Sequence, residues 1–209
     1  MGGTALPVGA FLIKHPDGVL LFDTGLGDEY PVFDGLLAPT VRRSLEGALI
    51  ASDVRPTDVK AVVNCHLHYD HAGGNPLFPG IPIVVQAREY DAAGQLAYLI
   101  PERVDFAGAE LRLVEGQEEI MAGVRVVPTP GHTPGHQSLV IDDVEGPLVL
   151  AGQASYTAAE FVDPKREPAR GYKTAWDQDA FLKSQAYLRG LKPQRVFFSH
   201  DERFWEPAR

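Results

Sequence analysis

The sequence predicts an α/β fold in the form of an αββα sandwich, with two β-sheets packed face to face and helices on the outside. Its apolar runs are short and rich in Val, Leu and Ile, and they are hydrophobic enough to be covered on both faces. Segments with helical spacing lie between groups of these runs, which favours a layered fold. The 209 residues are 44% hydrophobic, and the 21 glycines and 17 prolines are spread rather than pooled into a linker. We therefore expect one domain over residues 1–209.

The strands are expected at apolar runs bounded by turn residues. Val8–Ile13 and Val19–Phe22 flank His15-Pro16-Asp17-Gly18, which is typical of a hairpin because Asp-Gly tolerates a positive φ. A second hairpin is predicted at Asp142–Pro147. The other predicted strands, in chain order, are Ala61–Asn64, Ile83–Gln86, Leu111–Val114, Val124–Val127, Ser138–Ile141, Leu148–Ala151 and Arg195–Phe198.

Three helices are predicted from apolar residues that recur three and four positions apart. They cover Val41–Ala51, Arg88–Leu99 and Asp177–Leu188, and Gly94 weakens the second. Glu160–Trp176 lacks such a period, so we interpret it either as a lid or substrate loop, with Phe161 and Trp176 against a substrate chain, or as an exposed connection.

The charge balance and the cysteine count exclude several classes of protein. The chain has 28 acidic and 19 basic side chains and a net charge of −9, which disfavours a nucleic-acid partner. Its only cysteine, Cys65, cannot form an internal disulfide or a multi-thiolate metal site. The first residues lack a secretory signal, and no apolar run reaches the roughly 18 residues of a membrane span. A cytoplasmic protein without a membrane partner is the expectation.

Seven histidines are unevenly placed, and three of them fall within six residues. The string His66-Leu67-His68-Tyr69-Asp70-His71 follows a predicted strand and precedes a glycine turn, so four possible metal ligands share one loop. With this composition the pattern arises by chance in roughly one sequence in two thousand. The alternative is a polar loop whose histidines bond to solvent or backbone, but the rarity of the pattern favours a metal site.

The ligand types indicate zinc in a catalytic role. Neutral imidazoles and carboxylates bind zinc at neutral pH, and a site without thiolates is more typical of catalysis than of structural support. Further ligands are expected from other strand ends, where His132 and His136 follow one predicted strand and His200 follows another. Pro134 argues against a helix that presents both His132 and His136, so we interpret His136 as structural.

These residues resemble the metallo-β-lactamase superfamily of metal-dependent hydrolases, from Asp23-Thr24-Gly25 to His200. Longer strings are similar to its N-acyl homoserine lactonase branch, namely His66 to Asn75, Thr129 to Leu139 and Ala154-Ser155-Tyr156-Thr157. The resemblance implies the αββα fold. It also implies a first strand before the first predicted hairpin, although the start of this chain looks shorter than the starts of family members. It also implies two metal sites, the first held by His66, His68 and His132 and the second by Asp70, His71 and His200.

The chain departs from the family pattern at Gln153. In dinuclear members an aspartate at a strand end bridges the two metals, and the matching position here is a glutamine. An amide offers one neutral carbonyl oxygen in place of two anionic oxygens, so repulsion between the metals should rise. We expect one tightly bound Zn²⁺ and a second ion that binds more weakly or is absent.

The resemblance implies a lactonase in which metal-activated water opens the ring of a small-molecule lactone such as an N-acyl homoserine lactone. Tyr156 is the candidate for stabilising the oxyanion and Asp70 for carrying a proton to the leaving alkoxide. Asp23 is expected to orient a histidine ligand, and Cys65 to belong to the core. The alternatives are a hydrolase of thioesters, phosphoesters or other esters and, because of Gln153, a metal-poor binding protein that has lost activity. The oligomeric state stays open.

Overall fold

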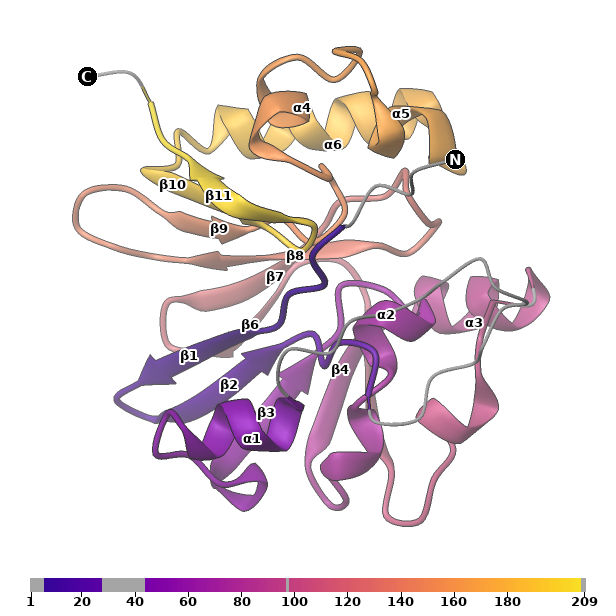
Figure 1. Ribbon diagram of the computed structural model, residues 1–209, viewed down its shortest axis with the longest axis vertical. Coiled ribbons are helices and arrows are strands. Elements are labelled where there is room, and N and C mark those ends of the chain that lie inside the picture. The colour runs from indigo at the N-terminus through magenta and orange to yellow at the C-terminus, as the bar shows by residue number, and fades with distance from the viewer. Residues whose placement is uncertain (1–5, 28–43, 97, 208–209) are drawn as a thin grey trace.

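The computed structural model describes residues 6–27, 44–96 and 98–207. Over these ranges two sheets pack face to face, and helices lie on the outer side of each (Figure 1). The predicted αββα sandwich is therefore confirmed. The first strand implied by the family resemblance would fall at the start of the chain, where residues 1–5 lie outside the described ranges.

The first sheet has the strand order β1-β2-β3-β4-β5. β1 and β2 form the predicted antiparallel hairpin, in which His15 pairs with Gly18, and the other neighbours are parallel. The strands are β1 (Phe11–His15), β2 (Gly18–Phe22), β3 (Val59–Val63), β4 (Pro82–Gln86) and β5 (Glu110–Val114).

The second sheet has the order β11-β10-β9-β8-β7-β6. Only β9 and β10 are parallel, and β8 and β9 form the second predicted hairpin. The strands are β6 (Glu118–Met121), β7 (Val124–Pro128), β8 (Gln137–Ile141), β9 (Leu148–Leu150), β10 (Arg195–Phe198) and β11 (Asp201–Trp205).

Helices cover both sheets, with α1 to α3 beside the first and α4 to α6 over the second (Figure 1). The three predicted helices are present as α1, α3 and α6, although residues 41–43 of the first prediction lie outside the described ranges. Asp177 caps α6 by accepting a hydrogen bond from the Ala180 N–H. The helices are α1 (Leu45–Ile50), α2 (Tyr69–Ala72), α3 (Ala87–Gln95), α4 (Ala158–Val162), α5 (Arg170–Thr174) and α6 (Gln178–Gly190). Short 3₁₀ turns occur at Pro56–Asp58, Asn75–Leu77 and Pro101–Arg103.

Three hydrophobic clusters are stacked through the sandwich, because neighbouring strand residues point to opposite faces. Leu20 and Phe22 of β2 pack between the sheets, whereas Leu21 packs on the outer face of the first sheet. In β8, Leu139 packs between the sheets and Val140 under the helices of the second sheet. Both faces of the central strands are thus buried, which explains their nearly continuous apolar sequences.

Part of Glu160–Trp176, which is expected to be a lid or substrate loop or an exposed connection, is helical. This stretch contains the end of α4 and all of α5. Phe161 is fully buried against Phe198 and Trp205, so it is a core residue and not a substrate contact. Trp176 is 53% exposed and stays available for a ligand.

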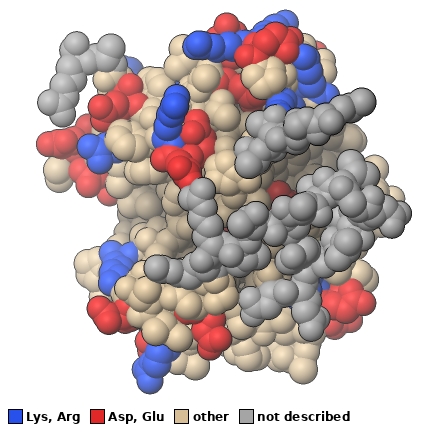
Figure 2. Space-filling view, viewed as in Figure 1, with Lys and Arg blue, Asp and Glu red and all other residues tan. Residues whose placement is uncertain are grey.

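Figure 2 shows acidic and basic side chains interspersed on the described part of this face rather than gathered into one basic patch. Among the described residues, no helix combines the length and apolar character that crossing a bilayer requires.

Gly131 lets the loop between β7 and β8 pack directly on α6. Its φ is +141°, and a Cβ there would lie 2.4 Å from both the N and the Cα of Phe181. We expect Gly131→Ala to lower the free energy of unfolding by about 3 kcal/mol, through overpacking and backbone strain. Gly190→Ala in α6 is the matched control, since its Cβ would meet nothing within 4 Å. Urea denaturation should show the control unchanged or more stable, and equal losses in the two variants would contradict this account.

Candidate metal centre

The predicted ligands meet where the ends of strands from both sheets converge. β3 of the first sheet leads into the segment 64–71, and β7 and β10 of the second lead into the loops that carry His132 and His200. Gln137 joins the sheets here, because its N–H donates to the Cys65 carbonyl at 2.8 Å and its Nε2 donates to the Asn64 carbonyl at 2.8 Å. Residues far apart in sequence are thereby held at one edge of the sandwich.

His66, His68 and His132 form the first triad. His68 Nδ1 lies 2.9 Å from His66 Nε2 and 3.2 Å from His132 Nε2. One ring nitrogen has either one proton or one lone pair, so it can make a full hydrogen bond to only one of these two neighbours. Nitrogens that share a tetrahedral zinc lie about 3.3 Å apart. The donor set therefore fits a metal ion better than a set of mutual hydrogen bonds.

Burial keeps the first triad in the form that binds metal. His66 is fully buried and His132 nearly so, and burial lowers the pKa of both well below the usual range. For His68, burial lowers the pKa to about 4, although the charge of Asp70 opposes the shift. The three imidazoles are therefore neutral near pH 7, as metal ligation requires.

Asp70, His71 and His200 form the second triad. Asp70 Oδ2 lies 3.6 Å from both His71 Nε2 and His200 Nε2. Burial opposes ionisation of Asp70, but the neighbouring histidines outweigh it and hold its pKa below the usual range. Within the described part of the chain, His71 Nε2 and His200 Nε2 are buried without a hydrogen-bond partner. These unpartnered nitrogens beside a carboxylate fit a second metal ion.

Gln153 lies between the second triad and the tyrosine expected to act with it. The residue is 3% exposed, and its side chain is close enough to His71 and Tyr156 to influence the pKa of both. Its Oε1 has no hydrogen-bond partner among the described residues, so the one oxygen that replaces a carboxylate is free to meet a ligand.

Tyr156 spans the two triads. Its ring centroid lies 5.9 Å from that of His132 and 4.9 Å from that of His200. Thr174 Oγ1 donates weakly to its hydroxyl at 3.4 Å. Burial raises the pKa of Tyr156, so the phenol stays protonated and can donate a hydrogen bond.

Asp23 contacts the ring nitrogen of His71 that faces away from Asp70, and it orients this histidine as the sequence predicts. Its Oδ2 lies 2.8 Å from His71 Nδ1, and both side chains are fully buried. This contact turns His71 Nε2 toward Asp70, the arrangement common for metal-ligating histidines. Asp23 also accepts a hydrogen bond from the Cys65 N–H at 2.7 Å.

Other residues around the triads were not found from the sequence. Asn75 accepts a hydrogen bond from Thr24 Oγ1 and donates to Asn64 Oδ1, and Asn64 in turn donates to the His71 carbonyl. Glu89 accepts four hydrogen bonds around the first triad. Burial raises the pKa of Glu89, and these bonds oppose the rise. The position of Asn75 after two glycines is a sequence signal that could have indicated a role near the site. Glu89 lies within a predicted helix, and its sequence gives no such signal.

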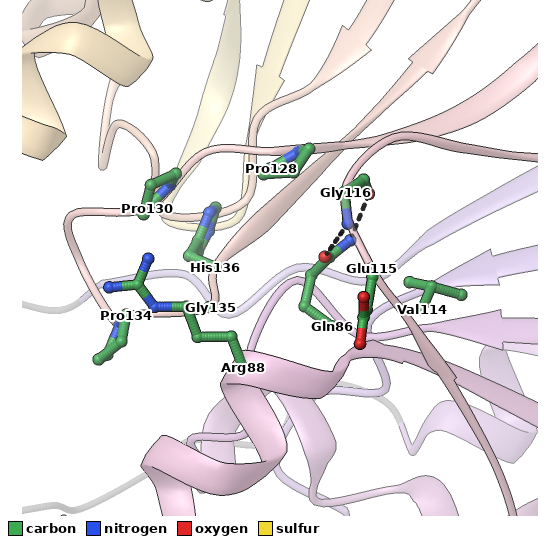
Figure 3. A pocket seen from close by; sticks show the side chains of 10 residues that line it. All are labelled: Gln86, Arg88, Val114, Glu115, Gly116, Pro128, Pro130, Pro134, Gly135 and His136. Atoms are coloured by element: carbon green, nitrogen blue, oxygen red, sulfur yellow. Dashed lines mark hydrogen bonds between the residues drawn. The ribbon is translucent and has the colours of Figure 1, made fainter.

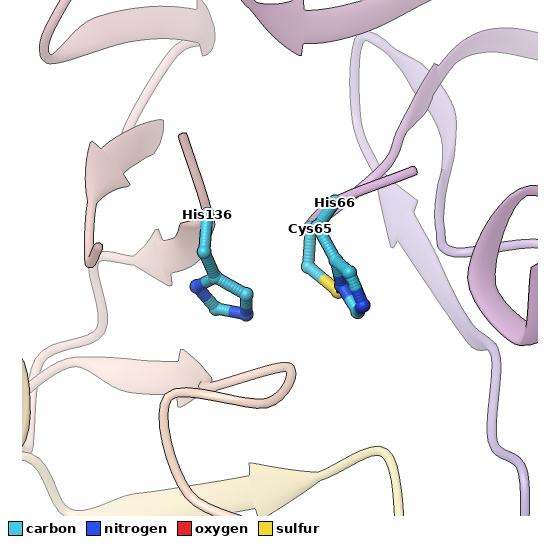
Figure 4. A group of neighbouring side chains, drawn as sticks. All are labelled: Cys65, His66 and His136. Atoms are coloured by element: carbon cyan, nitrogen blue, oxygen red, sulfur yellow. The ribbon is translucent and has the colours of Figure 1, made fainter. Parts of the chain in front are cut away.

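Cys65, His66 and His136 also lie close enough to resemble a metal site, and Figure 4 shows His136 facing the other two from a separate strand end. Burial raises the pKa of the Cys65 thiol well above its usual range, so a thiolate is disfavoured. His136 Nε2 accepts a hydrogen bond from the Gln153 N–H at 3.0 Å. Both residues are therefore structural, and the predicted place of Cys65 in the core is confirmed.

Acid should weaken the fold through His136. Burial, with the charge of His71, lowers its pKa from 6.5 to about 3. Between these values the unfolded chain holds a proton that the folded chain lacks. The free energy of unfolding therefore falls with falling pH, by about 1.4 kcal/mol per pH unit for one such group. Urea titrations from pH 7 to 5 should show the wild type losing stability faster than His136→Gln, and parallel curves would contradict the assignment.

A cavity of about 240 Å³ lies beside the loop between β7 and β8 (Figure 3). Gln86 on its wall is bound to Gly116 through two hydrogen bonds of 2.8 and 3.0 Å. Neither triad contributes to the lining, which is Gln86, Arg88, Val114, Glu115, Gly116, Pro128, Pro130, Pro134, Gly135 and His136. This cavity is separate from the candidate metal centre.

A family model described as the metallo-beta-lactamase superfamily matches residues 3–200. The chain belongs to the metallo-β-lactamase superfamily. A relative from Bacillus sp, an N-acyl homoserine lactonase, is 33% identical over 211 residues, which cover 94% of this chain and 82% of the relative. N-acyl homoserine lactonase AiiA from Bacillus thuringiensis subsp. kurstaki is 32% identical over 211 residues, which also cover 94% of this chain and 82% of the relative.

A solved structure of an N-acyl homoserine lactone hydrolase with the product N-hexanoyl-L-homoserine bound at the catalytic metal center is also similar to this superfamily member. It has a TM-score of 0.79 and 30% identity and covers 94% of this chain and 82% of that one. The fold is thus the metallo-β-lactamase fold that the resemblance implies. The superfamily and these relatives identify the chain as a metal-dependent hydrolase.

Proposed function

We propose that this chain is a zinc-dependent hydrolase that opens the lactone ring of N-acyl homoserine lactones. One observation carries the proposal: two largely buried triads lie at one edge of the sandwich, and the ligand atoms within each triad lie within 4.8 Å of one another. The lactonase relatives, which match 94% of the chain, supply the substrate class. The partner is thus a small molecule with an ester bond.

The proposed metal ligands are the residues predicted from the sequence. His66, His68 and His132 would hold one Zn²⁺ tightly, because three neutral imidazoles leave a position open for water. Asp70, His71 and His200 would hold a second, weaker ion, since Gln153 adds no negative charge. The unpartnered nitrogens of His71 and His200 and the free Oε1 of Gln153 support this division.

When bound, zinc would lower the pKa of a water molecule for attack and polarise the lactone carbonyl. The protonated Tyr156 hydroxyl would donate a hydrogen bond to the oxygen on which charge develops. Asp70, ionised because histidines surround it, would accept a proton and return it to the departing alkoxide. The exposed ring of Trp176 is proposed as an acyl-chain contact, because the backbone N–H of this residue donates to the carbonyl of His132 at 3.3 Å and so holds it beside the first triad.

Metal content and substrate turnover test the proposal together. Zinc-loaded chain should open N-acyl homoserine lactones, releasing one acid equivalent per turnover in a pH-stat, and should be slower on thioesters and phosphodiesters. A preference for either of those would support a related hydrolase instead. If no substrate is turned over and Gln153→Asp restores hydrolysis, the chain is a degenerate binding protein.

We also propose that residues 1–209 form one domain, because each triad takes two ligands from the first sheet and one from the second. A boundary between the sheets would divide both metal sites. The cytoplasmic location stays a prediction of the sequence.

A further inference from the structure

Glu89 is a fully buried carboxylate in the first turn of α3, outside both triads. Both of its oxygens accept two hydrogen bonds. Oε1 accepts from the Leu67 N–H at 3.0 Å and the Tyr98 hydroxyl at 2.9 Å. Oε2 accepts from the Thr133 hydroxyl at 2.7 Å and the Gly135 N–H at 3.1 Å. This is a large number of donors for one carboxylate, and three of them come from the segments that carry the first triad.

The sequence positions of these donors connect Glu89 to the first triad. Leu67 lies between His66 and His68, and Thr133 directly follows His132. The two segments come from different sheets, one after β3 and the other after β7. Glu89 therefore joins the two parts of the chain whose separation determines how far apart the three imidazoles lie.

Two close contacts restrict the same region. A Cβ on Gly135 would lie 2.1 Å from the Glu89 N and 2.4 Å from its Cα, so the loop packs directly on the start of α3. Tyr98 binds Glu89 through its hydroxyl, and its ring meets the ring of His68 edge-on with centroids 4.5 Å apart. The carboxylate thus lies in a region where small displacements move the ligands.

We propose that Glu89 is a positioning residue, whose carboxylate fixes the segment of His66 and His68 against the loop of His132 and so determines the geometry of the first metal site. The inference rests on the proposed function only in taking this triad as the zinc site. A carboxylate is needed because it only accepts hydrogen bonds. A glutamine would turn its NH₂ group toward one of the two donor pairs and leave a backbone N–H unpaired.

Zinc affinity tests the proposal without an activity assay. Competition with a chromophoric chelator should show zinc bound about 10- to 100-fold more weakly by Glu89→Gln than by the wild type. Thr133→Val, which removes a single donor and keeps the shape, should weaken binding about 3- to 10-fold. Tyr98→Phe is the matched control, since it removes one donor to the same carboxylate but leaves both ligand segments attached. It should bind zinc within about twofold of the wild type.

A cobalt spectrum and the stability of the metal-free chain separate positioning from simple support. Glu89→Gln loaded with Co²⁺ should show a changed visible absorption band, which reports the ligand field of the site. If Glu89→Gln and Thr133→Val lower the free energy of unfolding of the metal-free chain but bind zinc and cobalt as the wild type does, Glu89 is structural and the proposal is overturned. A wild-type chain that takes up no zinc would instead overturn the proposed function, and this inference with it.

Discussion

A Gln153→Asp variant should hold two zinc ions per chain after dialysis against zinc-free buffer, where the wild-type chain should hold one. The side chain at 153 lies beside His71 in the second triad, and the amide brings no negative charge there. A carboxylate about 4 Å from a divalent ion gains roughly 8 kcal/mol at an effective dielectric constant of 20, and the cost of desolvation offsets much of this gain. We therefore expect the second ion to bind about 100-fold more tightly in the variant.

Gln153→Asn is the matched control, because asparagine has the shape of aspartate without its charge. Elemental analysis and zinc titration should give one tight equivalent for the wild type and for this control, and two for Gln153→Asp. Two tight equivalents in the wild type would show that the glutamine oxygen suffices as a ligand. An unchanged count in Gln153→Asp would show that position 153 does not reach the second metal.

His68→Ala should lose tightly bound zinc and, with it, at least roughly 10³-fold in lactone hydrolysis. His68 supplies the nitrogen that faces both other members of the first triad. Two imidazoles cannot complete the open four-coordinate site that activates water. The side chain is part of the site surface and not of the three hydrophobic clusters, so the variant should fold.

His15→Ala is the control for this variant. His15 ends β1, where its Nδ1 accepts a hydrogen bond from the Asp17 N–H, and it belongs to neither triad. Its zinc content and rate should match the wild type within about twofold. Circular dichroism and thermal unfolding check that both variants are folded. A His68→Ala chain that keeps its zinc and its rate would show that the first triad is not the catalytic site.

The core strands could be predicted because both of their faces are buried. Ala61–Asn64, Ile83–Gln86 and Ser138–Ile141 are apolar almost throughout. The structure places them in β3, β4 and β8, with Asn64 directly after the end of β3. The two outer strands of the second sheet could not be predicted this way. β6 reads Glu-Glu-Ile-Met and β11 reads Asp-Glu-Arg-Phe-Trp, so each shows the polar composition of an edge strand rather than an apolar run.

The part of the candidate site that lies in local motifs could be predicted from the sequence. The spacing of His66, His68, Asp70 and His71 is visible in one loop. Strand ends add His132 and His200 as candidates, and the resemblance assigns one of them to each triad. What sequence could not supply is contact between distant segments. Glu89 is an ordinary helical glutamate until the fold places its carboxylate against Leu67 and Thr133.

Glycines provide a second example of such distant contacts. Gly131 and Gly135 flank His132 and read as a turn motif, but Gly131 packs on the backbone of α6 and Gly135 on that of α3. The two glycines of the repeated Thr-Pro-Gly-His string thus each pack on a helix, and the spacing of residues in the sequence does not predict these contacts.

Neither half of this chain contains a complete set of the proposed metal ligands. In each triad two ligands precede residue 72 and the third follows residue 131, and the ligand-bearing ends belong to different sheets. Ion binding is therefore thermodynamically linked to docking of one sheet on the other. If the polypeptide were cut between β5 and β6, neither fragment would bind zinc tightly alone, and tight uptake by the mixture would report that the halves had reassembled.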